Sequence, residues 1–399
     1  MASTAFDRLD KAFQQGGIDE TLSQLTAHLR VEKKYHELFE ARKMQLRRKL
    51  GLSIFAQDSR SLSPELRDQF EKGLLEVCRE VGMLLLKNHQ IRESWMYLRA
   101  LDEDELVRQT LGELDVPEDH NDELVELLFH EGLDPIRGYQ LVLAQHGTCN
   151  AITALDGRIS GLPADAKTAT TGALIDHIYE ELLANVRGHI QREEGTASED
   201  DNLSQLIQSR EWLTKDGNYH VDTSHLSSVV RLARYADDPT KLGRARELAA
   251  YGKTLEESLQ YPGSAPFEDM FATHELYLAA VLGERTDEAI AYFHDKAEAT
   301  DAYHEGTQAA EVYVELLLRC GQGEKAIAES IRLLPPGTHT TGLAPPLIEL
   351  SRHCGRYDDY LRICQKQDDV LGYVSGLALQ QESTPNLATA EDAGNEGGE

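Results

Sequence analysis

Cysteine and long hydrophobic runs are both scarce in this 399-residue chain. The five cysteines are an odd number and none forms a C-x-x-C pair, so we expect no disulfide framework, and a reducing cytoplasm fits better. The longest apolar run, residues 276–282, spans seven residues, whereas a membrane helix needs about 20. The first 30 residues contain no apolar run of signal-peptide length. We therefore expect a cytoplasmic protein that makes no contact with a membrane.

Basic residues are in deficit as well. Lys and Arg total 40 against 69 Asp and Glu, which gives a formal net charge of −29. Binding to DNA or RNA requires Lys and Arg to replace counterions along the phosphate chain, so we expect no nucleic-acid partner. An acidic field instead favours basic partners and speeds their encounter at low salt.

The sequence also lacks the alternating apolar pattern that is typical of β-strands. Apolar residues recur instead at three- and four-residue spacing, for example at Leu174, Ile178, Leu182 and Val186, which predicts amphipathic helices. The best strand candidate is residues 138–144. We interpret it as helix, because the preceding Asp134 and Pro135 match an N-cap followed by proline in the first turn. The prolines lie mostly between the apolar stripes, and we expect roughly 16 helices.

Two segments differ in composition from the rest of the chain. Residues 193–202 are acidic, small and polar, which predicts a linker between an N-terminal helical array, residues 1–192, and a C-terminal array, residues 203–379. Residues 380–399 have almost no large apolar residue. Such a segment cannot offset the entropy of ordering, so we expect a disordered acidic tail.

The C-terminal third repeats one pattern three times. A helical stretch ends in Gly283, Gly321 or Gly355, with separations of 38 and 34 residues, and an acidic residue then begins the next stretch. Glycine ends a helix well because it adopts positive φ without steric cost. An acidic residue in the first turn complements the positive end of the helix dipole. Small Ala289 and Ala326 then let the second helix approach the first.

This pattern resembles the tetratricopeptide-like family of helical-hairpin repeats over about residues 268–366. The repeats are irregular, and the family's small residue seven positions before the turn glycine is replaced here, for example by Leu276. The resemblance implies an all-α fold, a right-handed α-solenoid of tetratricopeptide-like hairpins. It also implies a concave groove that binds protein segments. Positions carried over from the turn glycines place seven residues on that face: Thr273, Tyr277, Glu311, Glu315, Arg319, Glu349 and His353.

One cluster has the composition of a metal site. The two imidazoles and one carboxylate of His220, Asp222 and His225 could bind zinc or iron. The same residues also match the start of a helix capped by Asp222, in which case His220 lies outside the helix and need not converge with His225. Gly252, Lys253 and Thr254 resemble the end of a phosphate-binding loop, but the earlier glycine of that loop is missing.

Two functions fit these patterns. We favour a protein–protein interaction scaffold or adaptor, which binds a protein or peptide segment on a concave helical surface without a cofactor, and whose acidic charge favours a basic segment. The alternative is a metal-dependent enzyme on an α-helical scaffold, with the metal at His220, Asp222 and His225. The sequence names no catalytic residue. It also leaves the oligomeric state open, including a structural role in which copies of the chain pack together.

Overall fold

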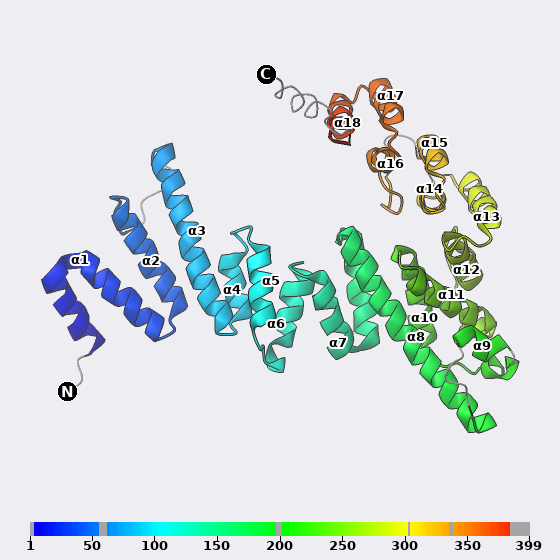
Figure 1. The fold of residues 1–399 in the computed structure, drawn as a ribbon, viewed down its shortest axis with the longest axis horizontal. Helices are drawn as coiled ribbons and strands as arrows, with labels where there is room; N and C mark the ends of the chain where they lie inside the picture. Colours follow the sequence, from blue (N-terminus) through cyan, green and yellow to red (C-terminus); the bar gives the residue numbers. More distant parts are fainter. Residues whose placement is uncertain are drawn as a thin grey trace, which may run out of the picture. The chain divides into compact units, whose positions relative to one another are not determined.

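The computed structural model describes residues 4–55, 62–196, 202–208, 210–301, 304–334 and 339–383. Within these residues the protein is all-helical, with eighteen α-helices and no β-strand (Figure 1). The predicted all-α class is therefore confirmed. The chain forms two compact units, Met1–Ala151 and Ile152–Glu399.

The first unit is built from helices that pack on their neighbours in sequence, as α1 to α4 do. Leu38, Val81 and Leu85 are fully buried in one core between α2 and α3. A second core gathers around Leu111 and Leu128. The helices are α1 (Ala5–Val31), α2 (Tyr35–Lys49), α3 (Pro64–Lys87), α4 (Ile91–Leu98), α5 (Asp104–Glu113), α6 (Asn121–Val125) and the first part of α7 (Pro135–Arg158).

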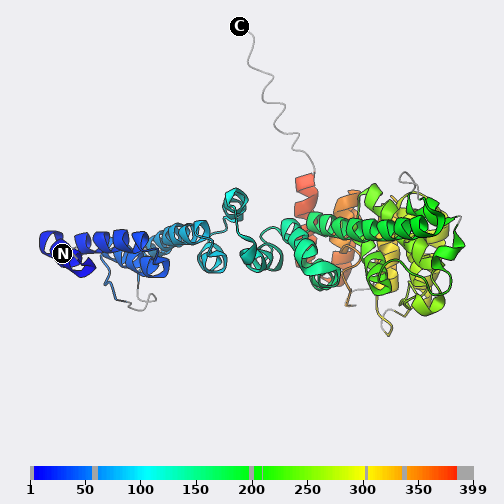
Figure 2. The ribbon, with the colours of Figure 1, turned by 90° about the horizontal axis from the view of Figure 1, so that it is seen from below.

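The second unit also follows chain order. Helix α8, the long green helix in Figure 2, contacts α9, α10 and α11. From α10 to α18 each helix packs on the next one. Its helices are the end of α7, α8 (Ala164–Glu194), α9 (Leu203–Gln208), α10 (Thr223–Leu232), α11 (Pro239–Thr254), α12 (Met270–Val281), α13 (Thr286–Ala299), α14 (Gln308–Arg319), α15 (Gly323–Leu333), α16 (Leu347–Cys354), α17 (Tyr357–Gln367) and α18 (Val370–Ser383).

Local sequence signals explain where these helices begin and end. Residues 138–144 lie in α7, which begins at Pro135, so the helical interpretation of this segment is confirmed. Gly283, Gly321 and Gly355 have φ of 84°, 74° and 66°, the left-handed conformation that glycine adopts without strain. Acidic residues occupy the first turns of α13, α15 and α17. The three turns therefore have the geometry that the glycines predicted.

The predicted start of the tail and the predicted linker can be compared with the structure. The predicted tail begins at residue 380, but residues 380–383 belong to α18, and residues 384–399 lie outside the described part of the chain. The predicted linker at 193–202 falls inside the second unit. Its first two residues end α8 and its residues 197–201 are not described, so its role as a boundary stays a prediction. No helix in the described ranges is long and apolar enough to span a bilayer.

Candidate functional site

A groove of about 1170 Å³ is the largest candidate site in the second unit. It is formed by the start of α8, the connection from α10 to α11, the ends of α12 and α15, helices α14 and α16, and the loop before α16. Its walls are mainly apolar, with Leu282, Leu318, Leu343 and Leu347 among the lining residues. Apolar walls with a few polar groups are typical of a surface that binds a ligand or a partner segment.

Four of the seven residues predicted for the concave face line this groove. Glu315 and Arg319 come from α14, one helical turn apart, and Glu349 and His353 come from α16 with the same spacing. Glu349 and His353 are exposed. Residues four apart lie on the same side of a helix, so each pair faces the groove together. The structure thus brings these four residues to one surface.

The other three predicted residues are buried and are not among the lining residues. The Thr273 hydroxyl donates to the carbonyl oxygen of Asp269 at 2.5 Å. Tyr277 is fully buried beneath the groove, beside Glu315 and Arg319, and burial raises the pKa of its phenol. Glu311 is also fully buried. None of these three side chains is on the surface for a partner to contact.

Glu311 holds the loop that forms one wall of the groove. Its carboxylate accepts hydrogen bonds from the backbone N–H groups of Thr341 and Leu343 at 2.7 and 2.8 Å. It also accepts from the hydroxyls of Thr307 at 2.6 Å and Thr341 at 3.1 Å. A carboxylate satisfied by several donors is stable in a buried position. The buried Glu311 therefore fixes residues 341–344 on α14.

Arg319 connects the groove floor to the start of α11. Its guanidinium donates to the carbonyl oxygens of Arg234 and Ala236 and to a carboxylate oxygen of Asp237 at 3.2 Å. Glu315 lies close to Arg319. Burial raises the pKa of the Glu315 carboxyl, and this effect exceeds the lowering by the positive charge of Arg319. Arg319 thus joins elements about 80 residues apart in sequence.

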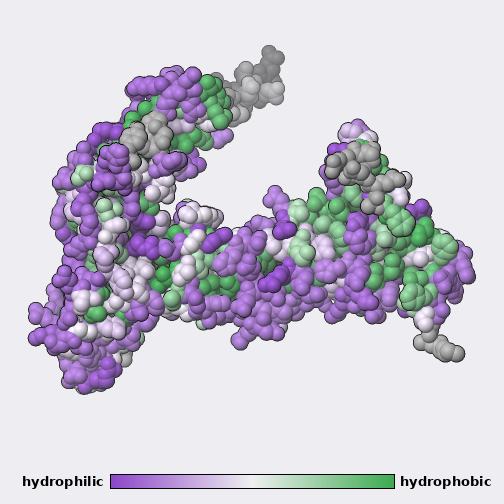
Figure 3. Space-filling view, turned by 180° about the vertical axis from the view of Figure 1, so that it is seen from behind, coloured by the Kyte–Doolittle hydropathy of each residue, from purple (hydrophilic) through white to green (hydrophobic). Residues whose placement is uncertain are grey.

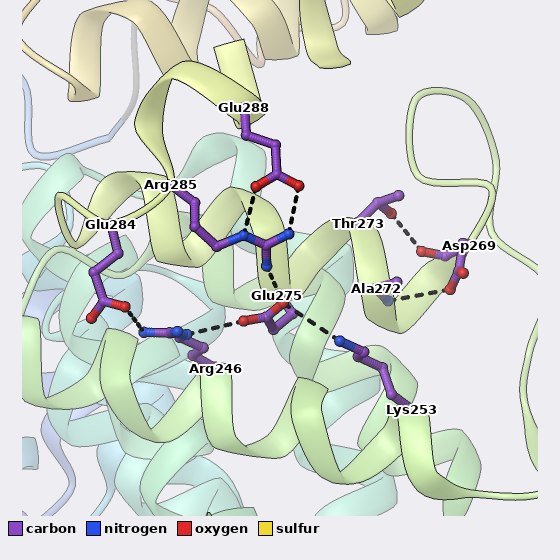
Figure 4. Close-up of polar contacts among 9 residues, drawn as sticks. All are labelled: Arg246, Lys253, Asp269, Ala272, Thr273, Glu275, Glu284, Arg285 and Glu288. Carbon is purple, nitrogen blue, oxygen red and sulfur yellow. Dashed lines mark hydrogen bonds and ion pairs between the residues drawn. The ribbon is translucent and has the colours of Figure 1, made fainter. Parts of the chain in front are cut away.

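An ion-pair network surrounds the buried carboxylate of Glu275 (Figure 4). Glu275 of α12 is 7% exposed and accepts hydrogen bonds from Arg246 of α11 at 3.1 Å and from Arg285 at 3.0 Å. The ammonium of Lys253 lies 3.6 Å from the same carboxylate. Arg246 also pairs with Glu284, and Arg285 with Glu288 (Figure 4). The network links α11, α12 and the start of α13.

The structure does not assemble the predicted metal ligands. His220 uses both ring nitrogens, with Nδ1 2.9 Å from the Tyr251 hydroxyl and Nε2 2.8 Å from Nδ1 of His189. Asp222 caps α10 by accepting from the N–H groups of Ser224 and His225. In the described ranges no group of three His, Cys, Asp or Glu side chains is placed to hold a metal ion. Asp222 is therefore the N-cap of α10, as the alternative interpretation predicted, and the described residues do not bring His220, Asp222 and His225 together as a metal site.

Two histidines, the buried His274 and the half-buried His220, make stability depend on pH. Burial lowers the pKa of His220 to about 4 and that of His274 to about 3. His274 is 2% exposed, its Nδ1 lies 2.6 Å from the Met270 carbonyl oxygen, and its Nε2 is buried without a hydrogen-bond partner. Protonation would place an unsolvated charge at Nε2.

We expect the second unit to lose stability as the pH falls from 6.5 towards 4. The folded pKa of His274 lies below the unfolded value of about 6.5, so the unfolded state binds more protons in this window, and the loss for His274 is about 2–3 kcal/mol. Urea unfolding at pH 7, 5.5 and 4.5 measures it. The variant His274→Phe keeps the ring packed on Phe267 and should show a shallower dependence. Equal slopes for both proteins would contradict this assignment.

Sequence reasoning missed the parts of the groove that lie outside the predicted repeats. These are the start of α8 with Lys167 and Thr168, the connection at Tyr235 and Asp237, and the loop at residues 340–346. Comparison with known proteins gives no further guide, because no family model, no curated protein and no solved structure matches this chain. The candidate site therefore rests on the geometry of the chain itself.

Proposed function

We propose that this protein is an interaction scaffold that binds a segment of a partner protein in the groove of the second unit. The observation that carries the proposal is the position of Glu315, Arg319, Glu349 and His353 on one apolar-walled groove. A groove of about 1170 Å³ accommodates several side chains of a partner segment. Glu311 and Arg319 hold its walls in place through buried hydrogen bonds, so the surface is preorganised for binding.

The proposed architecture is a right-handed α-solenoid of irregular tetratricopeptide-like hairpins. Three hairpins support it, α12 with α13, α14 with α15, and α16 with α17. Each has a turn glycine with positive φ between its helices, and each packs on the next hairpin. Ala289 and Ala326 are fully buried, which agrees with close approach of the paired helices. In such a stack each hairpin buries its apolar face on its neighbours.

The proposed partner segment is apolar with basic flanks. Leu282, Leu318 and Leu347 would contact its apolar side chains, whereas exposed Asp237 and Glu349 at the groove would attract its basic ones. The net charge of −29 adds a long-range attraction for such a segment. We place the protein in the cytoplasm, in line with the five cysteines, an odd number without a C-x-x-C pair.

Selection from a displayed peptide library against the full-length protein tests this proposal. We expect apolar peptides with basic flanks, whose dissociation constants rise several-fold when the salt concentration increases from about 50 to 300 mM, because salt screens exposed charges. The substitution Leu347→Asp places a charge in the groove wall at the first residue of α16, where an acidic residue suits the helix dipole. It should weaken binding about tenfold or more.

Val374→Asp is the matched control for this experiment. It makes a similar apolar-to-acidic change on α18, and Val374 does not line the groove. Peptide affinity should stay within about twofold of the unchanged protein. The proposal would be wrong if no peptide bound saturably, or if Leu347→Asp and Val374→Asp affected binding equally.

A further inference from the structure

The last described helix, α18, presents an apolar stripe to solvent. Val370, Leu371, Val374 and Leu377 are 69%, 80%, 56% and 43% exposed. Their three- and four-residue spacing places them along one side of the helix. The other side packs on α17, where Gly376 lies so close to Tyr360 and Leu361 that a Cβ atom would not fit. Figure 3 shows apolar surface at this end of the second unit.

The stripe also lacks charge in a strongly charged protein. No Asp, Glu, Lys, Arg or His occurs from residue 370 to residue 381, although the chain as a whole carries a net charge of −29. Two copies of so acidic a chain repel each other over most of their surface. An uncharged apolar face is the part of the second unit where two copies can approach without pairing like charges. Exposed apolar patches of this kind mark interaction sites.

The sequence that follows α18 is poorly suited to cover the stripe. Residues 384–399 contain one large apolar residue, Leu387, and four acidic residues. One leucine cannot match the four large side chains of the stripe. A second stripe supplies four aliphatic side chains with the same spacing, and a two-fold axis brings each face against an identical one.

We propose that α18 packs against α18 of a second copy of this chain, which forms a two-fold symmetric dimer. A single helix face buries less area than a standard interface, so dissociation in the range of about 1–100 µM is expected. Added salt screens the repulsion between the two acidic chains and tightens the dimer. Binding of a basic segment in the groove has the opposite salt dependence, so the two proposals succeed or fail separately.

Sedimentation equilibrium of the full-length protein tests the dimer. Over about 1–200 µM, the weight-average mass should rise from that of one chain towards that of two, and it should rise further at higher salt. Val374→Asp places a carboxylate at the centre of the stripe and should weaken the dimer at least tenfold. Leu347→Asp, the groove variant, is the matched control and should dimerise normally.

Three results would overturn this inference. The first is a monomer over the whole concentration range at both salt concentrations. The second is a Val374→Asp protein that associates as strongly as the unchanged chain. The third is a monomeric unchanged chain that dimerises only as Leu387→Asp, because residues 384–399 would then be the occupant of the stripe. If circular dichroism shows that Val374→Asp loses helix, Leu371→Ser, at the most exposed position, replaces it.

Discussion

Glu275→Ala is expected to lower the free energy of unfolding of the second unit by about 1–3 kcal/mol. The substitution removes a carboxylate that is 7% exposed and takes the shared partner from the partly buried Arg246 and from the exposed Lys253 and Arg285. The loss exceeds that of a surface ion pair because the carboxylate is buried and Arg246 stays partly desolvated, whereas the exposed Lys253 and Arg285 regain water. Glu284 and Glu288 still pair with the two arginines, which limits the loss.

Tryptophan fluorescence can assign this loss to the correct unit. The chain has two tryptophans, Trp95 in the first unit and Trp212 in the second. In a Trp95→Phe background, urea unfolding followed by fluorescence reports the second unit alone. Glu275→Gln keeps the size and one acceptor oxygen, and should cost about half as much as Glu275→Ala. If Glu275→Ala unfolded at the same urea concentration as the parent, the network would not stabilise the α11–α13 packing.

Glu311→Ala is expected to be at least as damaging, with a loss of about 3–5 kcal/mol. It removes the buried acceptor of the N–H groups of Thr341 and Leu343, whereas the Thr307 hydroxyl keeps the His339 carbonyl oxygen as an acceptor. Each unsatisfied buried donor costs about 1–3 kcal/mol. The loop at residues 341–344 should then detach from α14, and peptide binding in the groove should weaken with it.

Hydrogen exchange separates the local effect from the global one. In Glu311→Ala, the amides of residues 341–344 should exchange much faster than in the parent under conditions where both proteins are folded. Glu311→Gln keeps one acceptor oxygen and should give an intermediate rate. Glu275→Ala lowers stability but leaves Glu311 in place, so it is the matched control and should leave these amides protected. Equal exchange in all three variants would show that Glu311 does not hold the loop.

Local signals in the sequence predicted much of the fold. Asp222 caps α10, Pro135 begins α7, and the three turn glycines have positive φ. These features depend on a few neighbouring residues, because capping and steric freedom are properties of the local backbone. Periodicity alone predicted the helical class for the same reason.

The candidate site was predicted only in part, because it depends on contacts distant in sequence. The periodicity of a helix predicts on which face a side chain lies, but it does not predict which distant segment covers that face. Glu311 faces the predicted side, yet the loop at residues 341–344 covers it. Tyr277 is covered by the next hairpin. His220 bonds to His189 and Tyr251, partners 31 residues away in each direction, and no local pattern identifies such partners.

Hydrogen exchange of the full-length protein with and without a selected peptide tests the central proposal most directly. Bound peptide should slow exchange at the groove, in the loop at residues 340–346, at the start of α16 and in the connection that contains Tyr235 and Asp237. Residues of the first unit and of α18 should exchange at unchanged rates. Protection confined to other surfaces, with the groove amides unaffected by saturating peptide, would contradict the assignment of the groove as the binding site.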